Sequence, residues 1–99
     1  MSHRGSILCL PQGIWASDVK AAGDIDLASL SLPLADDANI DHFLIGTGKN
    51  LVPLRPAIRD GFRSRHIVVE PMSTGAAVRT YNILLGERRR VGALLIAVE

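Results

Sequence analysis

The sequence predicts an α/β fold in which helices flank a central mixed, mostly parallel sheet, and three observations support this. Short apolar runs rich in β-branched residues alternate with helical patterns in the second half of the chain. The stretch 72–85 lies between two such runs and has the apolar spacing of a helix packed on a sheet. Two successive strand–helix–strand units imply parallel strands, right-handed connections and helices on the faces of the sheet.

Length and composition set the class of protein. The chain has 99 residues, enough for one hydrophobic core, so residues 1–99 are expected to form a single domain. The apolar content of 47% excludes disorder, and the aromatic content of 4% requires an aliphatic core. The net charge of +1 is too balanced for nucleic-acid binding driven by bulk charge. No apolar run approaches the roughly 20 residues needed to span a bilayer, so a soluble cytoplasmic protein is expected.

The chain is expected to open with a short hairpin. Residues 6–10 form an apolar run that Pro11 and Gly13 end with a turn, and residues 14–16 continue as a second short strand. Trp15 is interpreted as a core residue or a cover for the sheet edge, about four times as often as a ligand-stacking residue.

Residues 18–39 mix helical and strand spacing. Asp26 is a candidate N-cap for a short helix through Leu27 and Leu30, which Pro33 would stop. The sequence assigns no definite element to this region.

A buried strand is expected at 42–45, followed by a helix over 53–63. Regular helix should begin close to Pro56, because proline is tolerated only in the first turn. Two apolar side chains four residues apart are expected to face the sheet and three arginines the other side: Ile58 and Phe62, then Arg55, Arg59 and Arg63.

The next strand is expected at 67–70, ended by Pro71, and its continuous β-branched run predicts a central position in the sheet. Ser73 or Thr74 then caps the helix that runs to residue 85. That helix has a narrow polar strip, which predicts that it is mostly buried, and Gly86 can end it. A final buried strand is expected at 91–98.

A candidate ligand crevice lies at the carboxyl ends of the strands at 43–45 and 67–69, where parallel sheets commonly bind ligands. The loops after both strands carry small residues and hydroxyls, and the second presents a helix N-terminus suited to a phosphate or carboxylate. Turn and capping roles for the same residues are weighted about two to one above ligand binding. The candidate residues of this crevice, between the Gly46–Gly48 and Met72–Gly75 loops, are Gly46, Thr47, Gly48, Met72, Ser73, Thr74, Arg79 and Asn82.

The sequence predicts no catalytic group, no metal site and no cofactor. Its three histidines are scattered without partners at metal-ligand spacing, and Ser73 lacks the G-x-S-x-G context of a nucleophile elbow. The pair Gly48-Lys49 fails as a phosphate loop, because the required flanking positions hold Phe43 and Asn50. The lone Cys9 excludes an internal disulfide and is interpreted as packing.

Four motifs together resemble a known family. They are Ser6–Pro11 with Gly13, Phe43–Gly48, Glu70–Ala77, and Arg79–Asn82 with Leu84. Their order and spacing resemble the uncharacterised domain family that includes mitochondrial complex I assembly factor 3 and the adipogenesis-associated domain protein. The chain is most similar to the alphaproteobacterial members of that family.

The resemblance implies a compact α/β domain with a central mixed sheet and no catalytic residues to carry over. It implies a non-catalytic assembly or adaptor domain in respiratory complex I biogenesis, with complex subunits or assembly factors as protein partners. It places eukaryotic relatives on the matrix side of mitochondria and a bacterial member in the cytoplasm. The rival hypothesis is an enzyme or sensor that binds a small anion in the crevice described above.

Two further expectations concern the beginning of the chain. Family members usually carry an extra stretch before the first motif, so this chain is expected to lack their leading strand. An incomplete sheet edge near residues 6–16 predicts pairing with another copy, that is, a homo-oligomer.

Overall fold

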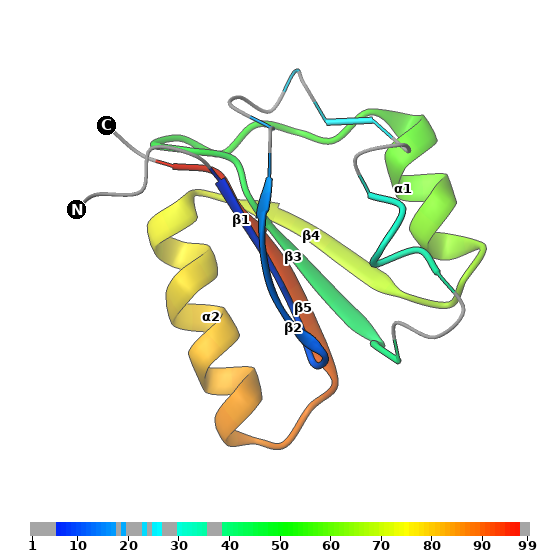
Figure 1. Cartoon of the computed structure of the whole chain (residues 1–99). Coiled ribbons are helices and arrows are strands. Elements are labelled where there is room, and N and C mark those ends of the chain that lie inside the picture. Colours follow the sequence, from blue (N-terminus) through cyan, green and yellow to red (C-terminus); the bar gives the residue numbers. More distant parts are fainter. Residues whose placement is uncertain are drawn as a thin grey trace.

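The computed structural model describes residues 6–17, 19, 23, 25–26, 30–35 and 39–97. Within these ranges five strands form one sheet in the order β2-β1-β5-β3-β4, and two helices pack on it (Figure 1). The elements, in chain order, are β1 (Ser6–Leu10), β2 (Gly13–Ser17), β3 (His42–Gly46), α1 (Pro56–Arg63), β4 (Val68–Met72), α2 (Thr74–Gly86) and β5 (Val91–Leu95).

The sheet is mixed, as predicted. The strand β1 pairs antiparallel with both β2 and β5, which confirms the hairpin. The strand β3 pairs parallel with both β4 and β5, which confirms the parallel strand–helix–strand–helix–strand unit. The strand β5 lies at the centre of the sheet, and all five of its residues are buried. A continuous apolar run suits such a strand, which is covered on both faces.

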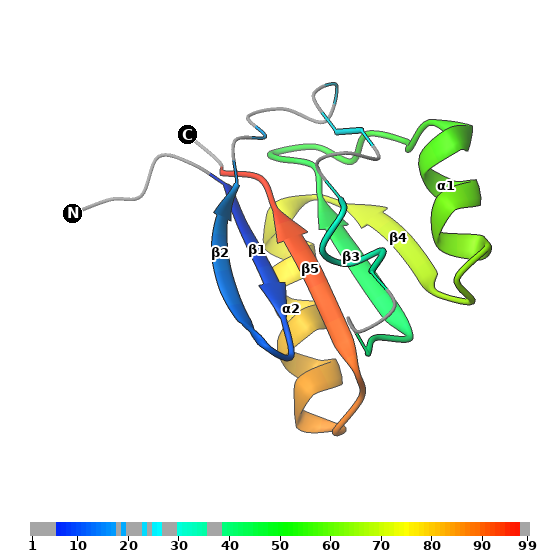
Figure 2. The ribbon, with the colours of Figure 1, turned by 45° about the vertical axis from the view of Figure 1, so that its right-hand side comes forward.

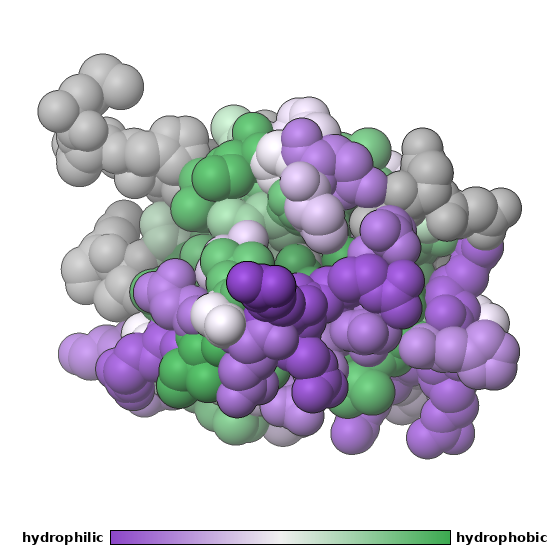
Figure 3. All heavy atoms as spheres, turned by 90° about the horizontal axis from the view of Figure 1, so that it is seen from below, coloured by the Kyte–Doolittle hydropathy of each residue, from purple (hydrophilic) through white to green (hydrophobic). Residues whose placement is uncertain are grey.

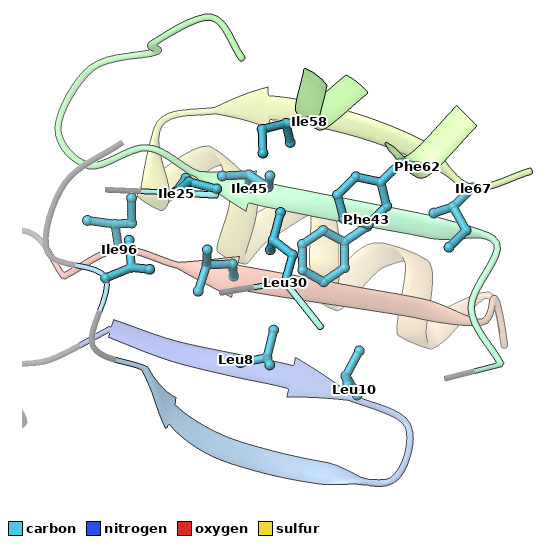
Figure 4. Packing of buried hydrophobic residues seen from close by; sticks show 12 residues of the cluster. Leu8, Leu10, Ile25, Leu30, Phe43, Ile45, Ile58, Phe62, Ile67 and Ile96 are labelled. Carbon is cyan, nitrogen blue, oxygen red and sulfur yellow. The ribbon is translucent and has the colours of Figure 1, made fainter. Parts of the chain in front are cut away.

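The two helices cover opposite faces of the sheet, as Figure 2 shows. Successive side chains of a strand point to opposite faces, so Phe43 and Leu44 enter different clusters. Phe43 stacks on Phe62 of α1, with ring centroids 5.0 Å apart. Leu44 packs with Ala77 of α2 on the other face. Figure 4 shows the larger cluster, on the α1 face.

Helix α1 begins at Pro56 and buries Ile58 and Phe62, as predicted. Its end is closed by a Schellman motif, which the sequence analysis does not anticipate. The His66 amide donates to the Arg63 carbonyl and the Ile67 amide to the Phe62 carbonyl, both at 3.0 Å. His66 holds the left-handed conformation, with φ of 59°, that such a motif usually gives to glycine.

The predicted central position of the strand after α1 is wrong, because β4 is an edge strand that pairs with β3. Part of the apolar run that suggested a central strand is Ile67, which precedes β4 and closes α1. Pro71 also does not end the strand, which continues to Met72. Alternate residues of β4 bond to β3, starting with the Val68 amide, so the proline lies at a position that loses no ladder bond.

The prediction that the second helix is mostly buried is also wrong. Among the described side chains of α2, Ala77 is the buried one, and Ile83 and Leu85 are 61% and 47% exposed. The helix packs on β3, β4 and β5, and no other described element covers its outer side (Figure 1). It ends at Gly86, but the left-handed residue that closes it is Arg88, with φ of 62°.

The remaining predictions concern the ends of the described ranges. The final strand is confirmed over Val91–Leu95. It ends before residues 96 and 97, which the predicted strand includes, and Val98 lies outside the described residues. The short helix proposed after Asp26 falls partly on residues that are not described, and residues 30–34 form a turn. Leu30 is buried against the α1 face of the sheet. Trp15 lies on the edge strand β2, opposite Leu8, and is 38% exposed, so it is not a core residue.

Candidate functional site

The carboxyl ends of β3, β4 and β5 meet at one rim, as the topology predicted. The Thr47 amide donates to the Met72 carbonyl over 2.7 Å, and the Ile96 amide donates to the Gly46 carbonyl over 3.0 Å. These bonds join the loop after β3, the end of β4 and the residue after β5. We call this region, comprising Gly46, Thr47, Gly48, Met72, Thr74 and Ile96, the carboxyl-end junction.

Thr74, the first residue of α2, links three segments of the junction. Its hydroxyl donates to the Ile96 carbonyl over 2.7 Å and accepts from the Gly48 amide over 3.0 Å. Its own amide donates to the Gly48 carbonyl over 2.8 Å. The hydroxyl therefore joins the N-terminus of α2 to the ends of two parallel strands.

The Thr47 hydroxyl organises the loop that follows β3. It donates to the Asn50 carbonyl over 2.7 Å, with the Met72 carbonyl at 3.1 Å, and it accepts from the Val52 amide over 3.0 Å. Thr47 is buried, so its hydrogen-bonding capacity is used inside the molecule.

Gly46 permits the close approach between β3 and α2. A Cβ atom at this position would lie 2.9 Å from the Thr74 Cα and 3.0 Å from the Thr74 hydroxyl oxygen. Relieving this overlap would require a shift of the α2 backbone, which costs free energy in a packed fold. Ser73 caps α2 by accepting from the Ala76 amide over 3.4 Å, which confirms one of the two predicted caps.

The structure brings together five of the predicted site residues: Gly46, Thr47, Gly48, Met72 and Thr74. Ser73 adjoins them as the cap. Arg79 and Asn82 are exposed further along α2, and within the described ranges neither forms a hydrogen bond with the junction. Ile96 was missed, because no local signal in the sequence relates residue 96 to residues 46 and 74. Only the pairing of β5 beside β3 reveals it.

Polar chemistry elsewhere in the described ranges is sparse. No group of three potential metal ligands occurs among the residues that the structure describes. Cys9 and Tyr81 share a side-chain hydrogen bond, and burial raises the pKa of the Cys9 thiol. Burial likewise raises the pKa of the Tyr81 hydroxyl, and the neighbouring thiol adds to that rise.

Figure 3 views the end of the molecule where α2 finishes and β3, β4 and β5 begin. Hydrophilic side chains spread across this end, in keeping with the exposed arginines at 88–90 in the loop that follows α2. In the described ranges, no helix has both the length and the apolar character needed to cross a membrane.

Comparison with known proteins decides the family. The family model described as "Protein of unknown function (DUF498/DUF598)" matches residues 1–96. The chain belongs to the DUF498/DUF598 family. This confirms the predicted resemblance, whose members include the assembly factors described next.

Two relatives are similar to this chain over most of its length. An uncharacterized protein of Rhodobacter capsulatus is 35% identical over 94 residues, covering 95% of this chain and 70% of that protein. NADH dehydrogenase (ubiquinone) 1 alpha subcomplex assembly factor 3 of Xenopus tropicalis is 35% identical over 92 residues, covering 93% of this chain and 50% of that protein. The chain thus spans about half the length of the assembly factor.

Solved structures of similar proteins share the fold. A crystal structure described as an outer membrane protein from Bartonella henselae has a TM-score of 0.91 and 45% identity, covering 100% of this chain and 83% of that one. A protein of Rhodopseudomonas palustris has a TM-score of 0.87 and 46% identity, covering 99% and 73%. A Bordetella pertussis protein described as an Mth938-like domain has a TM-score of 0.79 and 29% identity, covering 93% and 73%. The described residues therefore form a DUF498/DUF598 domain of Mth938-like fold.

Proposed function

We propose that this DUF498/DUF598 domain is a non-catalytic assembly or adaptor domain that binds protein partners during respiratory complex I biogenesis in the bacterial cytoplasm. The observation that carries the proposal is the 35% identity to an assembly factor 3 over 93% of the chain. This likeness extends over 92 residues and is not confined to one motif.

The carboxyl-end junction supports a scaffold role. The hydroxyls of Thr47 and Thr74 bond to main-chain groups of the chain itself. They hold two loops and a helix N-terminus in fixed relation, since buried polar groups that are fully bonded favour one arrangement. A rigid scaffold of this kind presents its surface to a partner without a large ordering cost.

A candidate partner surface lies where α2 runs beside the hairpin. Ile14 on β2 is opposite Cys9 on β1, and side chains directly opposite in an antiparallel pair share a face. Cys9 packs in the α2-side cluster and contacts Tyr81, so Ile14 lies on the α2 face of the sheet. Ile14 is 70% exposed.

The flank of α2 that borders the hairpin is also apolar. With 3.6 residues per turn, Val78 and Leu85 lie on the Tyr81 side of the helix, and Ile83 lies on the opposite flank. Both Val78 and Leu85 are exposed. We name Ile14, Val78 and Leu85 the hairpin–α2 surface, because grouped exposed apolar side chains mark protein-interaction sites.

The test is genetic and uses the organism that encodes the chain. Deletion of the gene should lower the amount of assembled complex I on native gels, with accumulation of partial assemblies, and the unmodified gene should restore it. A tagged copy should co-purify complex I subunits or assembly factors. Normal complex I in the deletion strain would contradict the proposal.

Paired variants then test the surface. Ile14→Lys with Leu85→Lys should fail to restore complex I, because two charges would enter an apolar contact. Ile83→Lys is the control, since it adds a charge at an apolar position on the other flank of α2 whose exposed fraction, 61%, lies between those of Leu85 and Ile14. Thermal unfolding of each purified variant checks that the fold is intact. Equal restoration by the double variant and the control would remove the hairpin–α2 surface from the proposal.

A second candidate function is binding of a small anion beside the N-terminus of α2. In the first turn of α2 the amides of Thr74, Ala76 and Ala77 already donate to acceptors within the chain, so the Gly75 amide is the candidate donor to an anion. The Arg79 guanidinium folds back toward Gly75, with one terminal nitrogen 3.8 Å from the place of a Gly75 Cβ. A cation beside a helix N-terminus suits a phosphate or carboxylate.

Thermal shift in the presence of nucleotides and phosphorylated metabolites tests this second function. A stabilisation that disappears in Arg79→Ala would support it. Unchanged melting with every compound in the set would contradict it.

A further inference from the structure

A groove runs between helix α1 and the outer edge of β4. Figures 1 and 2 show α1 next to β4, on the side away from β3. The groove has a volume of about 440 Å³ and is lined by Arg59, Arg63, His66, Ile67, Val68 and Val69. A second hollow of about 310 Å³ shares His66 and Ile67 with it. The second hollow extends the groove past the end of α1.

The main chain of β4 offers unused hydrogen-bonding groups to this groove. The Val68 amide donates to the Asp41 carbonyl before β3, and the Met72 carbonyl accepts from the Thr47 amide. In a parallel pair alternate residues bond to the neighbouring strand, so the peptide groups of Val69 point outward. Among the described residues none bonds to the Val69 amide or carbonyl. An unpaired strand edge of this kind is a template for another strand.

The two faces of this edge differ in chemistry. Val69 packs against the cluster on the α1 face, so Val68 and Glu70 point to the opposite face. On the α1 face stand Arg59 and Arg63, one helical turn apart and both exposed. Within the described ranges neither arginine has a carboxylate partner. On the opposite face Val68 is 50% exposed.

We propose that the α1–β4 groove binds an extended segment of a partner protein, which adds to β4 as a further strand. Its side chains would alternate between acidic residues, directed to Arg59 and Arg63, and apolar residues, directed to Val68. Glu70 lies on the Val68 face and disfavours acidic side chains there, which sets the order of the alternation. Main-chain hydrogen bonds give affinity in such complexes and alternate side chains give specificity.

This inference rests on the proposed function, because an extended peptide is a ligand for a protein that acts by binding other proteins. It adds the place and the chemical class of the partner. Charge complementarity identifies the segment as acidic, since the described residues that line the groove include two arginines and no carboxylate.

The first experiment measures peptide binding to the full chain by calorimetry and by NMR chemical shifts. The probe is a synthetic ten-residue peptide that alternates glutamate with valine. Two matched peptides accompany it, one with lysine in place of glutamate and one with the alternating amides N-methylated. Binding of the first peptide alone is expected, because the others lose the charge match or the main-chain bonds. Absence of binding by the glutamate peptide, or equal binding by the N-methylated one, overturns the proposal.

Charge-reversal variants locate the site. Arg59→Glu with Arg63→Glu should weaken binding of the glutamate peptide by about tenfold or more, since two attractive pairs become repulsive. Arg88→Glu with Arg89→Glu makes the same change in net charge at exposed positions outside the groove and should leave affinity within about twofold. Equal weakening in both double variants would show that only net charge matters and would overturn the site. Self-association of the chain that disappears in the groove variant would assign the groove to a second copy and also overturn it.

The same variants separate this inference from the proposed function. If deletion of the gene leaves complex I unchanged, the proposed function fails whatever the peptide data show. If deletion lowers complex I and the groove variant restores it fully, the groove fails and the proposed function stands. Loss of complex I in the groove variant, with normal levels in the control variant, supports both.

Discussion

Replacing Thr74 with valine should destabilise the domain at the rim of the sheet. Valine keeps the shape of threonine and removes the hydroxyl that joins α2 to the ends of β3 and β5. The Gly48 amide then loses its acceptor at 3.0 Å, and the Ile96 carbonyl loses its donor at 2.7 Å. Both residues are buried, so water does not replace the lost bonds without opening the junction.

The size of the effect follows from these two bonds. A buried group left without a partner costs about 1–3 kcal/mol, so Thr74→Val should lower the free energy of unfolding by about 2–4 kcal/mol. That is a large share of the roughly 5–15 kcal/mol that domains of this size possess. The melting temperature should fall by about 10–20 °C.

Urea and thermal denaturation followed by circular dichroism measure this change. Thr74→Ser is the matched control, because it keeps the hydroxyl and loses one methyl group, which costs about 1 kcal/mol or less. A loss below about 0.5 kcal/mol in Thr74→Val would refute the reasoning, within the accuracy of such measurements. So would a loss in the serine variant as large as that in the valine variant.

Three further predictions concern stability. Gly46→Ala should cost about 1–3 kcal/mol, since its Cβ would lie 2.9 Å from a main-chain atom of α2. Gly86→Ala, with no atom within 4 Å of its Cβ, is the near-neutral control in the same denaturation assay. His66→Gly and Arg88→Gly should each stabilise the domain by about 0.5–1 kcal/mol, because glycine relieves the left-handed backbone at the end of a helix; unchanged or lower urea midpoints would contradict this. Burial raises the pKa of the Cys9 thiol above its ordinary value of 9.0. The folded state therefore binds the thiol proton more tightly than the unfolded state does. This difference contributes fully to the stability of the fold below pH 9, and the contribution is lost as the pH rises further. The urea midpoint should fall above pH 9 in the natural protein and fall less in Cys9→Ala.

Local signals predicted most elements of the fold. The proline in the first turn set the start of α1 at Pro56, and the spacing of Ile58 and Phe62 set its inward face. Ser73 was predictable as the cap of α2, because capping depends on residues three apart in the chain. The meeting of the loops after β3 and β4 was also predictable, since parallel strands bring their carboxyl ends to the same edge.

The errors arose where the answer depends on distant residues. The apolar run around Val68 is compatible with a central strand or an edge strand, and only the sheet order decides between them. The apolar residues of α2 suggested burial, yet no described element packs over its outer side. The left-handed positions at His66 and Arg88 carry no glycine signal in the sequence.

The sequence by itself determined the types of the elements, the main helix start and cap signals and the alternation of strands with helices, because backbone preferences and side-chain periodicity act over a few residues. The tertiary structure alone decided the order of the strands, the exposed flank of α2, the participation of Ile96 in the carboxyl-end junction and the groove beside β4. These depend on which segments become neighbours across the sheet. Burial and hydrogen bonding between such segments are settled only when the whole chain packs together.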